Sequence, residues 1–186
     1  MAEQQQFPAF SRLLHWVMAI MVLAMLFIGV GMVASLTDYY RLVSIHKTLG
    51  ILILILVSIR LINRLINPPP PLPAGVQRWD RLAMNASIFM LYALMFALPL
   101  VGWGMLSAGG YPIVLYGPLS LPPILPQSPG LYAALRSTHT ILAFLLFAIF
   151  VAHFSGAMMH ALIFRDGVFE SMASIKARTR KTPAAD

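Results

Sequence analysis

Four long apolar stretches, at about 13–36, 46–66, 82–106 and 139–163, limit what this 186-residue chain can fold into. Each is close to the ~20 residues that an α-helix needs to cross the hydrocarbon core of a bilayer. Hydrophobic residues make up 59% of the chain, charged residues make up 10%, and the mean hydropathy is +0.80, which exclude an ordinary soluble domain. The sequence predicts an all-α integral membrane protein, with a four-helix transmembrane bundle over residues 1–170 and a basic tail over 171–186.

The first apolar stretch also has some features of a secretory signal peptide. Its apolar run is about twice as long as the 7–15-residue core of a signal peptide, and no small-residue cleavage site follows it. We therefore expect a retained helix.

The positive charges are distributed unevenly between the two sides of this four-span arrangement. Ten lie on the side of the N-terminus, the 67–81 loop and the tail: Arg12, Arg60, Arg64, Arg78, Arg81, Arg165, Lys176, Arg178, Arg180 and Lys181. Three lie on the other side: Arg41, Lys47 and Arg136. The positive-inside rule then predicts that both termini are cytoplasmic. The excess positive charge, +7 in total, orients the protein in the membrane and attracts anionic lipid head groups. Nucleic acid is therefore not an expected partner.

Four histidines lie in or beside the apolar stretches, where ionisable side chains are costly and usually mark a site. His139 and His153 are fourteen residues apart, which places them on one helix face about 21 Å apart. By depth, His46 matches His139 near the outer face, and His15 matches His153 near the cytoplasmic face. The chain has no cysteine, so any bound metal must rely on histidine.

Two histidines at matched depth on different helices can supply both axial ligands of a haem iron. We therefore predict two stacked b-type haems, each with two histidine ligands, and electron transfer as their chemistry. A lone histidine at a membrane boundary is more often a packing residue, but four in this depth pattern favour the haem interpretation. Zinc or another ion is a weaker alternative because the spans contain almost no carboxylates.

His160 and Arg60 are further candidates near the inner haem. His160 lies two turns beyond His153, and the sequence leaves open which of the two binds the iron. His160 is otherwise a candidate to contact a quinone or a haem propionate, to relay a proton, or to be a plain surface histidine. Arg60, fourteen residues after His46, has the same candidate contacts, or its side chain extends to the cytoplasmic interface.

Near the outer face, Lys47, Arg41 and Arg136 are candidates to steer a small anionic donor, or are ordinary boundary charges. Gly50, one turn after His46, would let a porphyrin approach the helix backbone, although glycine also promotes helix packing in membranes.

Several short motifs resemble the bacterial cytochrome b561 family, which is grouped with the cytochrome b subunits of nickel–iron hydrogenase and formate dehydrogenase. They are Arg12-Leu13-Leu14-His15-Trp16, Ile45-His46-Lys47-Thr48-Leu49-Gly50, Arg60-Leu61 with the Pro68–Pro71 run, Leu98-Pro99-Leu100-Val101-Gly102, and His139 with His153. The resemblance covers about residues 10–170. It implies a four-helix bundle in the bacterial inner membrane with two b haems, the outer one on His46 and His139 and the inner one on His15 and His153.

Within this family the chain is most similar to the stand-alone superoxide:ubiquinone oxidoreductases. That resemblance implies that electrons pass from superoxide outside the membrane, through both haems, to ubiquinone. The alternatives are an electron-relay subunit that docks to a larger dehydrogenase or hydrogenase, and a non-redox membrane protein that binds a divalent metal. Turnover of the purified protein alone separates the first two, and the third predicts a colourless protein.

Overall fold

The computed structural model describes residues 6–73 and 75–173, so part of the predicted basic tail, including Lys176, Arg178, Arg180 and Lys181, lies outside the described residues. Within these described residues, four helices are long and apolar enough to cross a membrane: α1 (Ala9–Ala34), α2 (Tyr39–Ile66), α3 (Arg78–Ala108) and α4 (Pro129–Met159), which continues as a helix to Phe164. The predicted all-α membrane bundle is confirmed.

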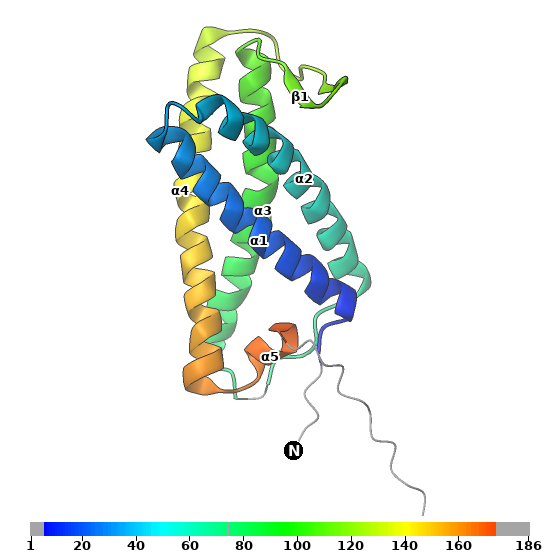
Figure 1. Ribbon diagram of the computed structural model, residues 1–186. Helices are drawn as coiled ribbons and strands as arrows, with labels where there is room; N and C mark the ends of the chain where they lie inside the picture. Colours follow the sequence, from blue (N-terminus) through cyan, green and yellow to red (C-terminus); the bar gives the residue numbers. More distant parts are fainter. Residues whose placement is uncertain (1–5, 74, 174–186) are drawn as a thin grey trace, which may run out of the picture.

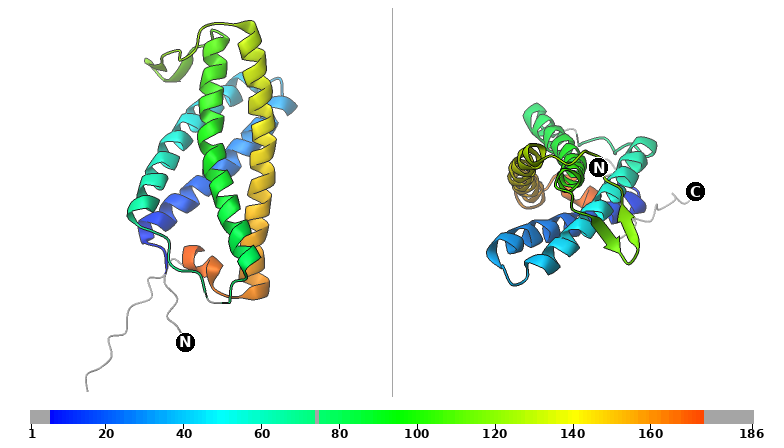
Figure 2. Two further views of the ribbon diagram at one scale, coloured as in Figure 1. Left: turned by 180° about the vertical axis from the view of Figure 1, so that it is seen from behind. Right: turned by 90° about the horizontal axis from the view of Figure 1, so that it is seen from above.

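The four helices form two pairs. α1 packs along α2, and α3 packs along α4, as Figure 1 and the views from behind and above in Figure 2 show. The α1/α2 pair crosses the α3/α4 pair obliquely. A buried apolar cluster from all four helices joins the pairs: Val22, Ile53, Leu94, Leu98 and Leu146.

The helices are longer than the apolar stretches that predicted them. α4 begins ten residues before His139, at Pro129, because Ser128 caps it by accepting a hydrogen bond from the Leu131 backbone N–H (3.3 Å). Serine followed by proline is a favoured helix start. The connection between α3 and α4 is correspondingly shorter than the gap between the apolar stretches 82–106 and 139–163.

Part of that connection is an antiparallel hairpin of β1 (Ile113–Tyr116) and β2 (Leu119–Leu121), which the apolar pattern did not predict. The hairpin packs against α2, where the Thr48 hydroxyl donates to the Leu115 carbonyl (3.2 Å). Trp103 on α3 donates its ring N–H to the Pro122 carbonyl (2.9 Å). We call this end of the bundle the hairpin end.

The opposite end carries a second unpredicted element. After α4, the π-helical segment His160–Phe164 leads to a left-handed residue, Arg165 (φ 50°), and then to the short helix α5 (Val168–Ala173). α5 lies beneath the bundle in Figure 1, where the Met172 carbonyl accepts a hydrogen bond from the Trp16 ring N–H (3.3 Å). We call this the α5 end.

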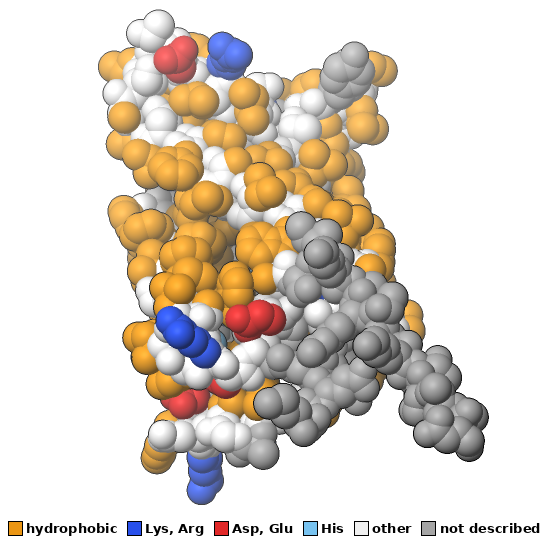
Figure 3. Space-filling model, turned by 60° about the horizontal axis from the view of Figure 1, so that its bottom comes forward, with side chains coloured by type: hydrophobic (Ala, Val, Ile, Leu, Met, Phe, Trp, Pro, Cys, Tyr) orange, Lys and Arg blue, Asp and Glu red, His pale blue; other side chains and the backbone are white. Residues whose placement is uncertain are grey.

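The surface matches a membrane environment. Hydrophobic side chains cover most of the face in Figure 3, and the charged side chains on it gather toward the two ends. Among the described residues, Arg12, Arg60, Arg64, Arg78, Arg81 and Arg165 lie in the half toward the α5 end, whereas Arg41, Lys47 and Arg136 lie in the half toward the hairpin end.

Candidate functional site

Near the hairpin end, His46 of α2 faces His139 of α4. Their ring centres are 6.1 Å apart and both side chains are half-buried. The Nδ1 atoms of both rings are buried without a hydrogen-bond partner. The backbone of Leu98 lies close to the His139 ring. Buried polar nitrogens without partners are rare in folded proteins and call for an explanation.

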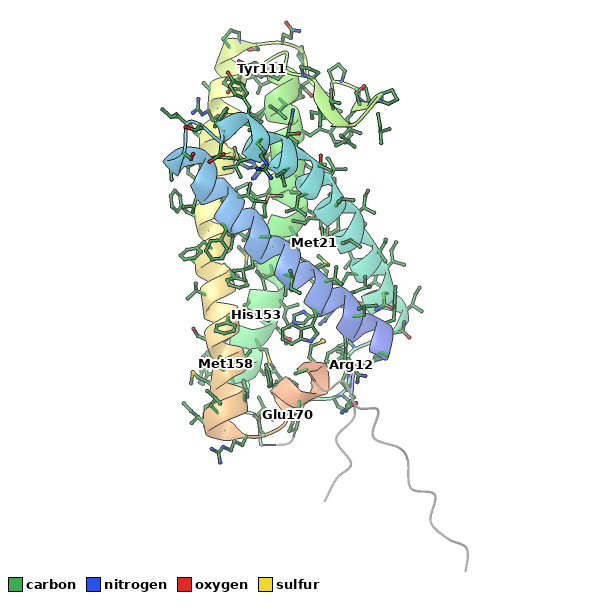
Figure 4. All side chains as sticks on the ribbon, in the orientation of Figure 1. Arg12, Met21, Tyr111, His153, Met158 and Glu170 are labelled. Atoms are coloured by element: carbon green, nitrogen blue, oxygen red, sulfur yellow. The ribbon has the colours of Figure 1, made fainter. Side chains whose placement is uncertain are left out.

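Nearer the α5 end, His15 of α1 faces His153 of α4, with ring centres 6.4 Å apart. Figure 4 labels His153 in the lower half of the bundle, above α5. Ser87 of α3 lies beside it, with its hydroxyl oxygen 3.4 Å from His153 Nδ1. Trp16 packs edge-on against His15, with ring centres 5.4 Å apart.

The spacing within both pairs fits a metal held between two imidazoles. Metal–imidazole nitrogen bonds are about 2 Å long, so two rings on opposite sides of one metal have their centres about 6 Å apart. The two pairs show separations of 6.1 and 6.4 Å. Within the described residues, no group of three or more histidine, cysteine, aspartate or glutamate side chains gathers in one place. The two histidine pairs therefore have the donor set of bis-histidine haem sites.

A buried apolar layer separates the two pairs. Leu146 is seven residues from both His139 and His153 on α4, Ile53 is seven residues after His46, and Val22 is seven residues after His15. Seven residues are almost two helical turns, about 10 Å, so these side chains share a face with the histidines at mid-depth. The sequence spacing that aligned the histidines also positions this layer.

His160 has a different environment from His153. Its Nδ1 lies 2.7 Å from the Asp166 carboxylate, and the residue is only 7% exposed. The other Asp166 oxygen accepts a hydrogen bond from the Val168 backbone N–H (3.1 Å), which links His160 to the start of α5. His160 is therefore not the plain surface histidine that the sequence left open, and it is engaged by a carboxylate while His153 faces His15.

Arg60 lies inside the bundle beside the inner pair. Its Nε donates to the Tyr92 hydroxyl of α3 (3.1 Å), and its Nη1 is buried without a partner. It interacts electrostatically with both His15 and His153. The buried Arg60 Nη1 does not match the alternative in which the side chain extends to the cytoplasmic interface.

The three cations near the hairpin end have fewer specific contacts than Arg60 or His160. Lys47 is half-buried and donates a long hydrogen bond to the Pro112 carbonyl (3.5 Å), whereas Arg41 and Arg136 are exposed. A Cβ built on Gly50 would meet only the Met25 methyl, at an ordinary 3.7 Å.

Near the histidines lie the motif residue Gly102 and two residues, Ser87 and Tyr92, that had no assigned role in the sequence analysis. A Cβ built on Gly102 would lie 3.4 Å from His139 Cε1, so this glycine allows the ring to pack closely against α3. Ser87 and Tyr92 lie on the same helix, which has no histidine. In the sequence, only their polarity within an apolar span marked them, and polarity alone does not show which residue a side chain contacts.

Over residues 6–174, the sequence matches the family model of prokaryotic cytochrome b561. The chain belongs to this family. It is thus a cytochrome b561-type electron-transfer protein of the inner membrane, from a family that binds b-type haem, and the resemblance seen in its motifs is confirmed.

Two curated relatives illustrate the family. The chain is 32% identical to cytochrome b561 homolog 2 of Escherichia coli (strain K12) over 172 residues, which cover 90% of this chain and 91% of the relative. It is 26% identical to the probable superoxide oxidase CybB of Yersinia pestis over 128 residues, which cover 69% of this chain and 72% of that relative.

Proposed function

We propose that this cytochrome b561 carries electrons across the membrane by means of two b-type haems. His46 and His139 would hold the outer haem, and His15 and His153 the inner one. The observation that supports this most directly is the repeated pairing of imidazoles at 6.1 and 6.4 Å, on either side of one apolar layer. Each haem, held by its two histidines, would supply one-electron transfer.

The proposed donor is superoxide at the hairpin end. The name of the Yersinia pestis relative supports this donor, and the chain offers three cations there: Arg41, Lys47 and Arg136. Cations near a surface raise the local concentration of a small anion by electrostatic steering.

The proposed acceptor is ubiquinone at the α5 end. His160 is a candidate to contact it and to relay a proton, because its ring lies at this end of the protein with Nδ1 2.7 Å from the Asp166 carboxylate. Arg60 is the second candidate contact.

The orientation that goes with this proposal places the N-terminus, the 67–81 loop and the C-terminal tail in the cytoplasm. Six of the nine cationic residues that the structure describes lie in the half toward the α5 end, as the positive-inside rule requires of the cytoplasmic side.

The test uses the purified protein in detergent. A pyridine haemochrome assay is expected to give two b haems per chain, and the oxidised protein is expected to be reduced by superoxide and reoxidised by ubiquinone. Superoxide dismutase should abolish the reduction. Two haems that are inert to superoxide would instead support the relay subunit of a larger dehydrogenase, and a colourless protein would overturn the haem proposal.

A further inference from the structure

Arg60 is a cation in the interior of a membrane-spanning bundle. It lies within α2, which contributes no histidine to the inner pair. Among the described residues, no carboxylate forms a salt bridge with it. A buried charge without a counter-charge is costly, and charges within membrane spans usually mark a functional site.

The side chain is nevertheless held in place. Tyr92 accepts a hydrogen bond from Arg60 Nε (3.1 Å), and the guanidinium carbon lies 6.0 Å from the centre of the Tyr92 ring, within the range of a cation–π contact. These contacts engage one edge and one face of the guanidinium. Nη1 remains buried and unpartnered. Arg60 therefore has an unused donor next to the inner histidine pair.

We propose that Arg60, positioned by Tyr92, is the counter-charge of the inner haem and raises its reduction potential above that of the outer haem. The inference rests on the proposed two-haem function. The propionate carboxylates of haem b would give the buried Nη1 of Arg60 an anionic partner. A nearby cation favours the more electron-rich state of a cofactor, and it does so more strongly in a medium of low dielectric.

This arrangement would give electron transfer a direction. Arg60 interacts electrostatically with both imidazoles of the inner pair, whereas among the described residues no arginine or lysine interacts in this way with the imidazoles of the hairpin-end pair. A higher potential at the inner site would draw electrons from the hairpin end toward the α5 end.

The experiment is a potentiometric titration of the purified protein, followed by its haem absorbance. The parent is expected to show two steps. Arg60→Gln should move one step to lower potential and leave the other in place, and Tyr92→Phe should move the same step by less, because it removes only the hydrogen-bond acceptor. Arg64→Gln, one turn further along α2, is the matched control and should leave both steps unchanged.

The step that moves is assigned in a His46→Ala/His139→Ala background, which retains only the inner haem. There, Arg60→Gln should shift the single remaining step. If Arg60→Gln releases the inner haem altogether, Tyr92→Phe carries the test, because it preserves the ring and its packing.

Two haems per chain with both steps unmoved in Arg60→Gln and Tyr92→Phe would overturn this inference and leave the proposed function intact. Unmoved potentials with a raised KM for ubiquinone would also overturn it, and would assign Arg60 to the quinone. Fewer than two haems in the parent would instead overturn the proposed function itself.

Discussion

His153 and His160 lie two turns apart on one continuous helix, and their neighbours separate their roles. His153 faces His15 across the bundle, while His160 is held by Asp166 and packs edge-on against Phe164. Spacing alone left both as candidate ligands of the inner iron, because residues seven apart share a helix face. The choice depends on which groups the surrounding helices bring to each ring.

His153→Ala is therefore expected to remove one of the two haems, whereas His160→Ala should keep both. Under the proposed assignment, His153→Ala would remove a haem ligand, but His160→Ala would remove only the partner of Asp166. The pyridine haemochrome count per chain measures the difference. Loss of haem from the His160 variant, with full occupancy in the His153 variant, would reverse the assignment.

Gly102 offers a second test at this scale. Gly102→Ala would place a methyl group 3.4 Å from His139 Cε1, at the close end of ordinary van der Waals contact. We expect an altered spectrum and potential of the outer haem with the inner haem unchanged. Gly29→Ala is the control, because a Cβ there meets nothing within 4 Å. Equal spectra for both variants and the parent would show that the Gly102 packing does not matter.

At the scale of elements, the two histidine pairs depend on the apolar layer between them. Val22, Ile53 and Leu146 come from three helices and meet Leu94 and Leu98 of α3. In a membrane, helices associate through close packing of this kind because lipid is as apolar as the side chains. The layer therefore couples the α1/α2 pair to the α3/α4 pair.

Leu146→Ala should lower the free energy of unfolding by about 2 to 5 kcal/mol, the usual cost of emptying a packed site. Phe144→Ala, on the same helix, should cost much less, since Phe144 is 72% exposed and Leu146 is 6% exposed. Loss of haem absorbance during titration with sodium dodecyl sulfate compares the two. Equal sensitivity would contradict a packing role for the layer.

The hydropathy pattern did not predict two elements, the β1–β2 hairpin and α5. The hairpin and α5 are short, and their stability comes from distant partners such as Thr48 and Trp16. Isolated hairpins and helices of this length are marginal in water. The early start of α4 does have a local signal in the sequence, Ser128 followed by Pro129. The hydropathy pattern outweighed this signal in the prediction.

At the scale of the whole molecule, the uneven distribution of cations predicts one orientation in the membrane. Because the chain has no cysteine, single cysteines can be introduced on a background that gives no labelling. Ser120 is exposed in the hairpin, and Gln77 is exposed before α3, at the other end.

Ser120→Cys should react with a membrane-impermeant maleimide in intact spheroplasts, whereas Gln77→Cys should react only after lysis. The reason is that cationic segments are retained on the cytoplasmic side during insertion. The parent chain serves as the control for background labelling. The opposite pattern would invert the orientation and, with it, the proposed direction of electron flow.

The sequence by itself determined the number of spans, the family and the matched depths of His15, His46, His139 and His153. These features are local, since apolar length and the 3.6-residue helical period can be read along one segment. The tertiary structure decided the partners. Ser87 meets His153 across 66 residues, Tyr92 meets Arg60 across 32, and Trp16 meets α5 across 156. Such contacts depend on how the helices rotate and cross, and packing of the assembled bundle sets those angles.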